Sequence, residues 1–141
     1  MAITWQKMVP EIDVSDFAVS LDFYTRILGF KVLFARRDPE FAYLELEELQ
    51  FMLSEYRDSG WVVAPLEKPY GRGMNLQMEL TDIGPVYQRL LDNDAALFQD
   101  MKDTWRETGD VLSGQREFLV QDPDGYLLRF CQLLEDRPIE P

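Results

Sequence analysis

Hydrophobic and polar positions follow the same order twice along this chain. An alternating extended run comes first, then a segment of helical periodicity, then three more extended runs. The first copy opens at residues 9–14 and the second at residues 75–80, and these runs lead into Ser15-Asp16 and Thr81-Asp82. Ser, Thr and Asp side chains accept hydrogen bonds from the first N–H groups of a helix, so both pairs predict helix starts. The pattern therefore indicates two strand–helix–three-strand units, although the two copies share few identical residues.

Apolar residues recur at helical spacing after each of these pairs. In the first copy they are Phe17, Leu21, Tyr24 and Leu28, and Gly29 is expected to end the helix. In the second copy they are Ile83, Val86, Tyr87, Leu90 and Leu91, with Pro85 in the first turn and Asn93 at the end. The other strands are expected at residues 31–35, 41–46, 49–55, 96–99, 116–121 and 126–133.

The segments between these elements set the organisation of the chain. A length of 141 residues predicts one domain with its own core. We expect module one at about 8–58, a linker at 59–73 and module two at about 74–134. The linker contains Trp61, and a second segment expected to be irregular, residues 100–114, contains Trp105. Each tryptophan either clamps its loop onto the core or forms a stacking wall for a flat ligand or a partner chain.

Composition and charge exclude several functions. The chain has no histidine, which rules out Ser-His-Asp and Cys-His catalysis and any Cys/His zinc site. A formal net charge of −12 argues against nucleic acid as a partner. The apolar runs are too short to cross a membrane, and the first residues do not resemble a secretion signal, so a cytoplasmic protein is expected. The single cysteine, Cys131, lies in an apolar strand pattern and is expected to be a buried thiol.

The most distinctive local motif is the turn Asp122-Pro123-Asp124-Gly125, which predicts a hairpin between two strands. The stretch QDPDGYLLRF at 121–130, taken with PEIDVSDFAVSLDFYTRILGF at 10–30, resembles the vicinal oxygen chelate superfamily. Within that superfamily the likeness is strongest to bleomycin-resistance proteins and their glyoxalase-like relatives, and it covers almost the whole chain. The resemblance implies an α+β fold of two βαβββ modules that enclose a cleft, paired in a dimer.

The resemblance also allows the metal ligands of the superfamily's enzymes to be compared with this chain. The matching positions hold Val9, Met52, Asn75 and Arg129. Val and Met are poor ligands for hard cations, and Arg adds a positive charge where the ion would lie. We therefore expect no metal and no cofactor.

The drug-binding relatives match the chain better. They are metal-free dimers whose N-terminal segment crosses to the partner at a proline that matches Pro10. Their drug groove implies roles for Phe34, Phe41 and Ser54. Two departures stand out: Gly114 replaces a stacking tryptophan, and Gln77 and Glu79 replace aromatic residues. Trp61 or Trp105 is the candidate for the lost stacking surface.

Strand alternation places Glu11 and Asp13 on one face of the first strand, and Gln77 and Glu79 on one face of the fifth. Glu11, Asp13 and Glu79 would make the cleft acidic, which suits a cationic ligand. Alternatively, Glu11 and Asp13 lie at an exposed rim or pair with Arg129 or Arg116.

Two function classes follow. The first is a non-catalytic homodimer that sequesters a bleomycin-like or other bulky aromatic or cationic small molecule, with antibiotic resistance as its consequence. The second is a glyoxalase-like lyase or isomerase, or a dioxygenase relative, with non-standard site residues, in which Glu11 or Glu79 acts as the base.

Overall fold

The computed structural model describes residues 2–140, and these form two compact units. Unit 1 runs to Arg72 and also contains the short segment Asp122–Tyr126. Unit 2 contains Gly73–Gln121 and the residues from Leu127 onward. Among the described residues, no helix is long and apolar enough to cross a membrane.

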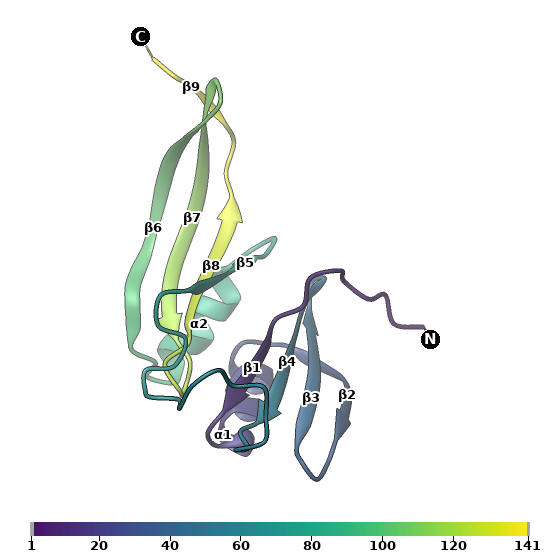
Figure 1. Cartoon of the computed structure of the whole chain (residues 1–141). Coiled ribbons are helices and arrows are strands. Elements are labelled where there is room, and N and C mark those ends of the chain that lie inside the picture. The colour runs from purple at the N-terminus through teal and green to yellow at the C-terminus, as the bar shows by residue number, and fades with distance from the viewer. Residues whose placement is uncertain (1, 141) are drawn as a thin grey trace. The chain divides into compact units, whose positions relative to one another are not determined.

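Unit 1 is a four-stranded sheet with one helical segment (Figure 1). Its elements are β1 (Glu11–Val14), α1 (Phe17–Asp22), the π-helical turn η1 (Phe23–Ile27), β2 (Lys31–Arg36), β3 (Phe41–Leu46) and β4 (Leu49–Glu55). The strand order in this sheet, sheet 1, is β1-β4-β3-β2. The outer strand β1 runs parallel to β4, and the other neighbours are antiparallel.

Unit 2 repeats this arrangement (Figure 1). Its elements are β5 (Asn75–Glu79), α2 (Gly84–Asp92), β6 (Leu97–Thr108), β7 (Val111–Gln121), β8 (Leu127–Leu133) and the short β9 (Arg137–Pro138). The order in sheet 2 is β5-β8-β7-β6, with β9 paired to β7. Because the first four strands of each unit follow the same relative order in their sheet, the duplicated βαβββ pattern is confirmed.

Local signals place both helices close to where they were predicted. The carboxylate of Asp16 accepts from the Val19 N–H at 3.2 Å and caps α1. Gly29 follows η1 with a φ of 94°, a left-handed conformation that glycine adopts without steric strain. The start of α2 differs slightly, because Ile83 is its N-cap and Asp82 accepts instead from the Gly84 N–H.

Each helix covers one face of its own sheet with aromatic side chains. In unit 1 the ring of Tyr24 lies 4.7 Å from that of Phe51. In unit 2 Tyr87 lies 5.2 Å from Phe118, which stacks on Phe130 at 5.3 Å. Burial of each such ring contributes about 1.5–3 kcal/mol. The opposite, helix-free face of each sheet is therefore the place to look for a ligand site.

The main difference from the expected elements lies at residues 100–114, which were predicted to be irregular. This stretch belongs to a long hairpin in which β6 and β7 pair from Leu97 and Val120 to Thr108 and Val111. Gly109, with a φ of 68°, lies in the connecting turn. Ion pairs between the two strands, such as Arg116 with Asp103 at 2.8 Å, replace the apolar contacts that usually reveal a strand.

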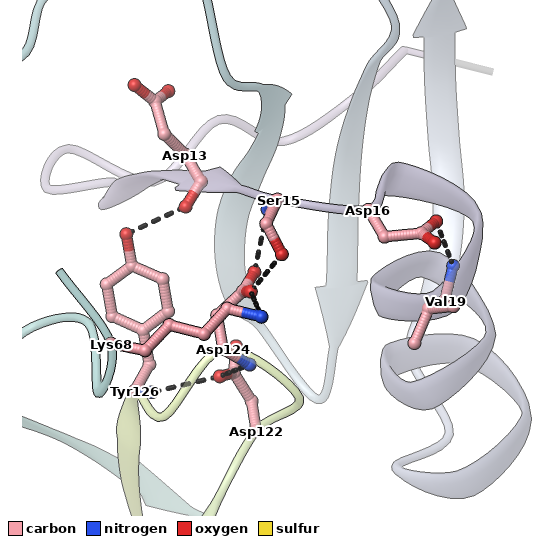
Figure 2. Close-up of polar contacts among 8 residues, drawn as sticks. All are labelled: Asp13, Ser15, Asp16, Val19, Lys68, Asp122, Asp124 and Tyr126. Atoms are coloured by element: carbon pink, nitrogen blue, oxygen red, sulfur yellow. Dashed lines mark hydrogen bonds and ion pairs between the residues drawn. The ribbon is translucent and has the colours of Figure 1, made fainter. Parts of the chain in front are cut away.

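The predicted hairpin turn is present, and its carboxylates are buried (Figure 2). Asp122 accepts hydrogen bonds from the N–H groups of Asp124 and Tyr126, both at 2.9 Å. Its second oxygen accepts from the buried Tyr24 hydroxyl at 2.7 Å. Burial raises the pKa of the Asp122 carboxyl, while these three hydrogen bonds oppose the rise. The turn is thus built around the nearly inaccessible carboxylate of Asp122.

The same turn holds the end of β1 in place (Figure 2). Asp124 accepts from both the backbone N–H and the hydroxyl of Ser15, and Lys68 Nζ lies 3.4 Å from its carboxylate. The Tyr126 hydroxyl donates to the Asp13 carbonyl oxygen at 2.8 Å. These contacts fix the backbone on which Glu11 and Asp13 are presented.

Candidate ligand-binding site

Two rows of side chains cross the helix-free face of sheet 1. Residues paired across neighbouring strands share a face, so the strand register defines each row. The first row is Glu11, Met52, Tyr43 and Phe34, and the second is Asp13, Ser54, Phe41 and Arg36. Four of the five predicted site residues of unit 1 therefore lie on one face: Glu11, Phe34, Phe41 and Ser54.

The aromatic end of this face is formed by three rings. Phe34 and Tyr43 stack with centroids 5.2 Å apart and planes 17° apart. Phe41 lies 6.0 Å from Phe34 and is only 8% exposed. The Arg36 guanidinium lies 4.5 Å above the Phe41 ring and 5.4 Å from that of Phe34. A planar cation thus already rests on these rings, in the geometry of a cation–π contact.

The N-terminal segment covers part of the same surface, which the sequence did not reveal. The Trp5 indole meets Tyr43 edge-on at 5.1 Å and Phe34 at 5.9 Å. The buried Gln50 side chain holds this segment, accepting from the Gln6 N–H at 2.9 Å and donating to the Thr4 carbonyl oxygen at 2.8 Å. Trp5 therefore borders the aromatic surface of sheet 1, and its side chain remains 57% exposed.

The β1 edge of this face is acidic. Ser54 donates a hydrogen bond to Glu11 at 2.6 Å, which links two predicted site residues directly. Burial raises the pKa of the Asp13 carboxyl, the Glu11 carboxylate raises it further, and Arg57 opposes the rise. The expected acidic character is therefore present at this edge, two strands away from the aromatic rings.

The helix-free face of sheet 2 is of mixed charge. Arg129 donates to Gln77, and the register brings Glu79 opposite Cys131, which pairs on its other side with Glu117. Lys102 is the β6 partner of Glu117, so cationic side chains lie beside carboxylates on this face. Burial raises the pKa of the Cys131 thiol, and Glu79 raises it further. Glu79 thus belongs to a mixed polar surface.

The two tryptophans singled out from the sequence differ in their surroundings. Trp61 is 96% exposed, so it does not clamp its loop onto the core. Trp105 lies in β6 opposite Gly114, and Arg137 stacks 3.6 Å above its ring. By alternation along β7, Gly114 shares the face of Phe118, so Trp105 is on the helix-bearing face and not with Gln77 and Glu79.

A Cβ at residue 114 would lie 2.4 Å from the Trp105 ring. The indole therefore fills the space above Gly114 from the neighbouring strand. This packing explains why glycine is needed at a position where the resemblance implies a tryptophan.

Some positions of this chain match the metal ligands of the superfamily's enzymes, and the residues found there do not fit a metal ion. Among residues 2–140, no group of three or more His, Cys, Asp or Glu side chains could hold one. Met52 presents a thioether, and Arg129 presents a guanidinium that is engaged with Gln77. No step of a metal-dependent reaction can be derived from these side chains.

Comparison with known proteins agrees with this fold. Residues 10–130 match the family model described as the Glyoxalase/Bleomycin resistance protein/Dioxygenase superfamily. The chain is 27% identical over 142 residues to a bleomycin resistance protein of Geobacillus stearothermophilus, covering 92% of this chain and 98% of the relative. It is 28% identical over 132 residues to a lactoylglutathione lyase of Escherichia coli O157:H7, covering 88% and 87%.

Solved structures show the same fold. A protein of unknown function from Agrobacterium tumefaciens str. C58 is 25% identical, with a TM-score of 0.68 and coverage of 94% of this chain and 98% of that one. TioX from Micromonospora sp. ML1 is 20% identical, with a TM-score of 0.69 and coverage of 92% and 100%. The α+β fold of two βαβββ modules is thereby confirmed. The chain belongs to the glyoxalase, bleomycin resistance protein and dioxygenase superfamily.

Proposed function

We propose that this protein is a metal-free binding protein that sequesters an aromatic cation of the bleomycin type on the helix-free face of sheet 1. The observation that carries the proposal is the Arg36 guanidinium resting on the Phe41 and Phe34 rings. A surface that accepts an internal planar cation has the electron-rich ring faces that a cationic ligand requires. The relatives named as bleomycin resistance proteins support the same reading.

The acidic β1 edge supplies the second part of the proposal. Glu11 and Asp13 are not neutralised by a salt bridge among the ion pairs of the described residues. Exposed carboxylates attract a cation over about 10 Å at 0.1 M salt. A ligand with a flat ring system and a separate positive group would therefore reach both ends of this face. The protein is proposed to do this as a homodimer, with Pro10 at the segment that crosses to the partner.

Calorimetric titration with bleomycin tests the proposal. Phe34→Ala and Phe41→Ala should each weaken binding by about 1–3 kcal/mol, the scale for one large apolar side chain. Phe98→Ala is the matched control, because Phe98 is 64% exposed on β6 and should leave the affinity unchanged. Binding should also weaken as salt is raised. Unchanged affinity in both ring variants, or unfolding of Phe41→Ala, would contradict the assignment.

Tryptophan fluorescence locates the ligand independently of affinity. The double variant Trp61→Phe, Trp105→Phe keeps Trp5 as the remaining tryptophan. Bleomycin should change the emission of Trp5 in this variant, because Trp5 contacts both Phe34 and Tyr43. If only Trp61 or Trp105 responds in the complementary double variants, the ligand lies elsewhere.

A second candidate function is a glyoxalase-like lyase, favoured by the relative named lactoylglutathione lyase. Glu11 and Glu79 are its candidate bases, on β1 and β5 respectively. Formation of lactoylglutathione, abolished by Glu11→Gln or Glu79→Gln and not by Glu107→Gln on β6, would establish this activity. Absence of turnover together with tight bleomycin binding would favour the sequestering function.

A further inference from the structure

The indole of Trp105 in unit 2 already holds a planar cation. The Arg137 guanidinium lies 3.6 Å from the centroid of the ring, well within the range of a cation–π contact. Arg137 belongs to residues 134–138, here called the strap, which follow β8 and pair with the outer end of β7 at Leu112. The structure therefore shows directly which chemical group this indole accepts.

Three adjacent strands bring the ring and the cation together. Trp105 in β6 lies opposite Gly114 in β7, and a Cβ at residue 114 would collide with the ring. The indole therefore lies over the β7 backbone, where no side chain competes for the space. Arg137 reaches the ring from β9, the strand that pairs with β7 beyond the end of β8.

Carboxylates on both sides of Trp105 favour a cation at this position. Asp103 and Glu107 come two residues before and after Trp105 in β6, so they share its face of sheet 2. The hydrogen bond from Arg116 lowers the pKa of the Asp103 carboxyl, and the charge of Arg137 contributes to the same shift. An anionic ligand would therefore be disfavoured beside this ring, whereas a cation is attracted to it.

The strap has few contacts that resist its opening. Its β9 part is two residues long, and both Arg137 and Pro138 are exposed. Pro138 has no N–H, so it cannot donate a hydrogen bond to β7. At the other end, the Leu134 N–H donates to the Gly114 carbonyl oxygen at 2.9 Å. Because local opening costs least where contacts are few and exposed, Arg137 can leave the ring while β6 and β7 stay paired.

We propose that Trp105 is a binding site for a guanidinium group and that Arg137 occupies it as a displaceable internal ligand. A second guanidinium, from a small guanidino compound or from an arginine side chain of another chain, takes the place of Arg137 when the strap opens. An ammonium of the same charge lacks the planar face that stacks on an indole. The site goes beyond the function proposed for sheet 1, because it lies on the helix-bearing face of sheet 2.

Titration of the full chain with methylguanidine and methylammonium, with the Trp105 indole N–H followed by NMR, tests this site. The two probes carry the same charge and one methyl group each, and they differ in the planar head group. A strap that is closed about nine-tenths of the time lowers the apparent affinity about tenfold, so Arg137→Gln should bind methylguanidine about tenfold more tightly than the parent protein. Lys102→Gln is the matched control, because it removes the same charge from the opposite face of β6 and should leave the affinity unchanged.

A peptide with the sequence of residues 136–139, acetylated and amidated at its ends, distinguishes the two sources of guanidinium. Tighter binding of the peptide than of methylguanidine would support an extended arginine-bearing segment, and equal binding a small guanidino compound.

A second variant covers the case in which Arg137→Gln disturbs the hairpin. Arg137→Lys keeps the charge and should give a smaller gain in affinity for methylguanidine. No gain in either variant, or equal shifts with methylammonium, would overturn the proposal and leave the stacking of Arg137 on Trp105 as a structural contact only. Because bleomycin binding to the sheet 1 variants is measured separately, failure here leaves that result standing.

Discussion

Replacing Asp122 tests how the buried turn stabilises unit 1. Its carboxylate accepts from the Tyr24 hydroxyl and from the N–H groups of Asp124 and Tyr126. Asp122→Ala removes the acceptor of all three hydrogen bonds, and each buried donor left unpaired costs about 1–3 kcal/mol. Some water will enter the space, so the expected loss in the free energy of unfolding is about 3–5 kcal/mol.

Asp122→Asn should behave very differently. The amide oxygen can still accept from both backbone N–H groups, and the amide nitrogen can donate to the Tyr24 hydroxyl oxygen. The variant also removes a buried charge, so its unfolding free energy at neutral pH should stay within about 1 kcal/mol of the parent protein. Urea titrations followed by circular dichroism measure both changes, with the exposed Asp136→Asn as control.

The sign of the pH dependence follows from the raised pKa of Asp122. The folded state holds this proton more tightly than the unfolded chain does. The carboxyl therefore stabilises the fold most below its ordinary pKa of 3.8, and that contribution is lost as the pH rises through the higher folded pKa. Relative to the parent, Asp122→Asn should gain stability over that same rise. A loss below about 1 kcal/mol in Asp122→Ala, or an Asn variant as damaged as Ala, would refute the reasoning.

The remaining predictions concern packing, charge and assembly. Gly114→Ala should lower the unfolding free energy by about 1–3 kcal/mol through collision with the Trp105 ring, and adding Trp105→Ala should make the Gly114→Ala change nearly neutral in calorimetry. Trp5→Ala should strengthen bleomycin binding about 2–10-fold, because a ligand then has no indole to displace; weaker binding would make Trp5 a wall of the site. As the pH is lowered, affinity for the cation should begin to fall while the pH is still above 3.8, because the raised pKa of Asp13 means that its carboxylate protonates there. Asp13→Asn should remove that part of the pH profile. Light scattering should give about twice the 16.5 kDa chain mass, and elemental analysis of protein purified without chelator should give well under one metal per chain; a monomer or a stoichiometric metal would contradict these two expectations.

The sequence predicted the elements whose signals are local. Strands β3 and β4 begin and end at the expected residues, and the Asp16 cap and the turn at Gly125 are also present. These features depend on alternation, capping and a required positive φ, all of which can be read within a few residues.

Features that depend on distant partners were missed. The outer half of the β6–β7 hairpin is mostly polar, although it contains Trp105, Val111 and Leu112, and cross-strand pairs such as Arg106 with Glu117 contribute to its strand character. Trp5 lies against Phe34 and Tyr43, and Gln50, far along the chain, binds the backbone on either side of it. A glutamine alternating with apolar residues at the start of β4 was the available signal, but it does not identify its partner.

The assignment of Asp122–Tyr126 to unit 1 has a consequence for synthesis of the chain. Although most of unit 1 has left the ribosome once Arg72 emerges, its Ser15 and Tyr24 side chains then still lack the carboxylates that they bind. These hydrogen bonds of unit 1 can form only after β6 and β7 have been translated. A ribosome-arrested chain ending before residue 122 should therefore hold the first half in a loosely packed, protease-sensitive state. Folding of the first unit therefore depends on a segment that is synthesised after most of the second unit.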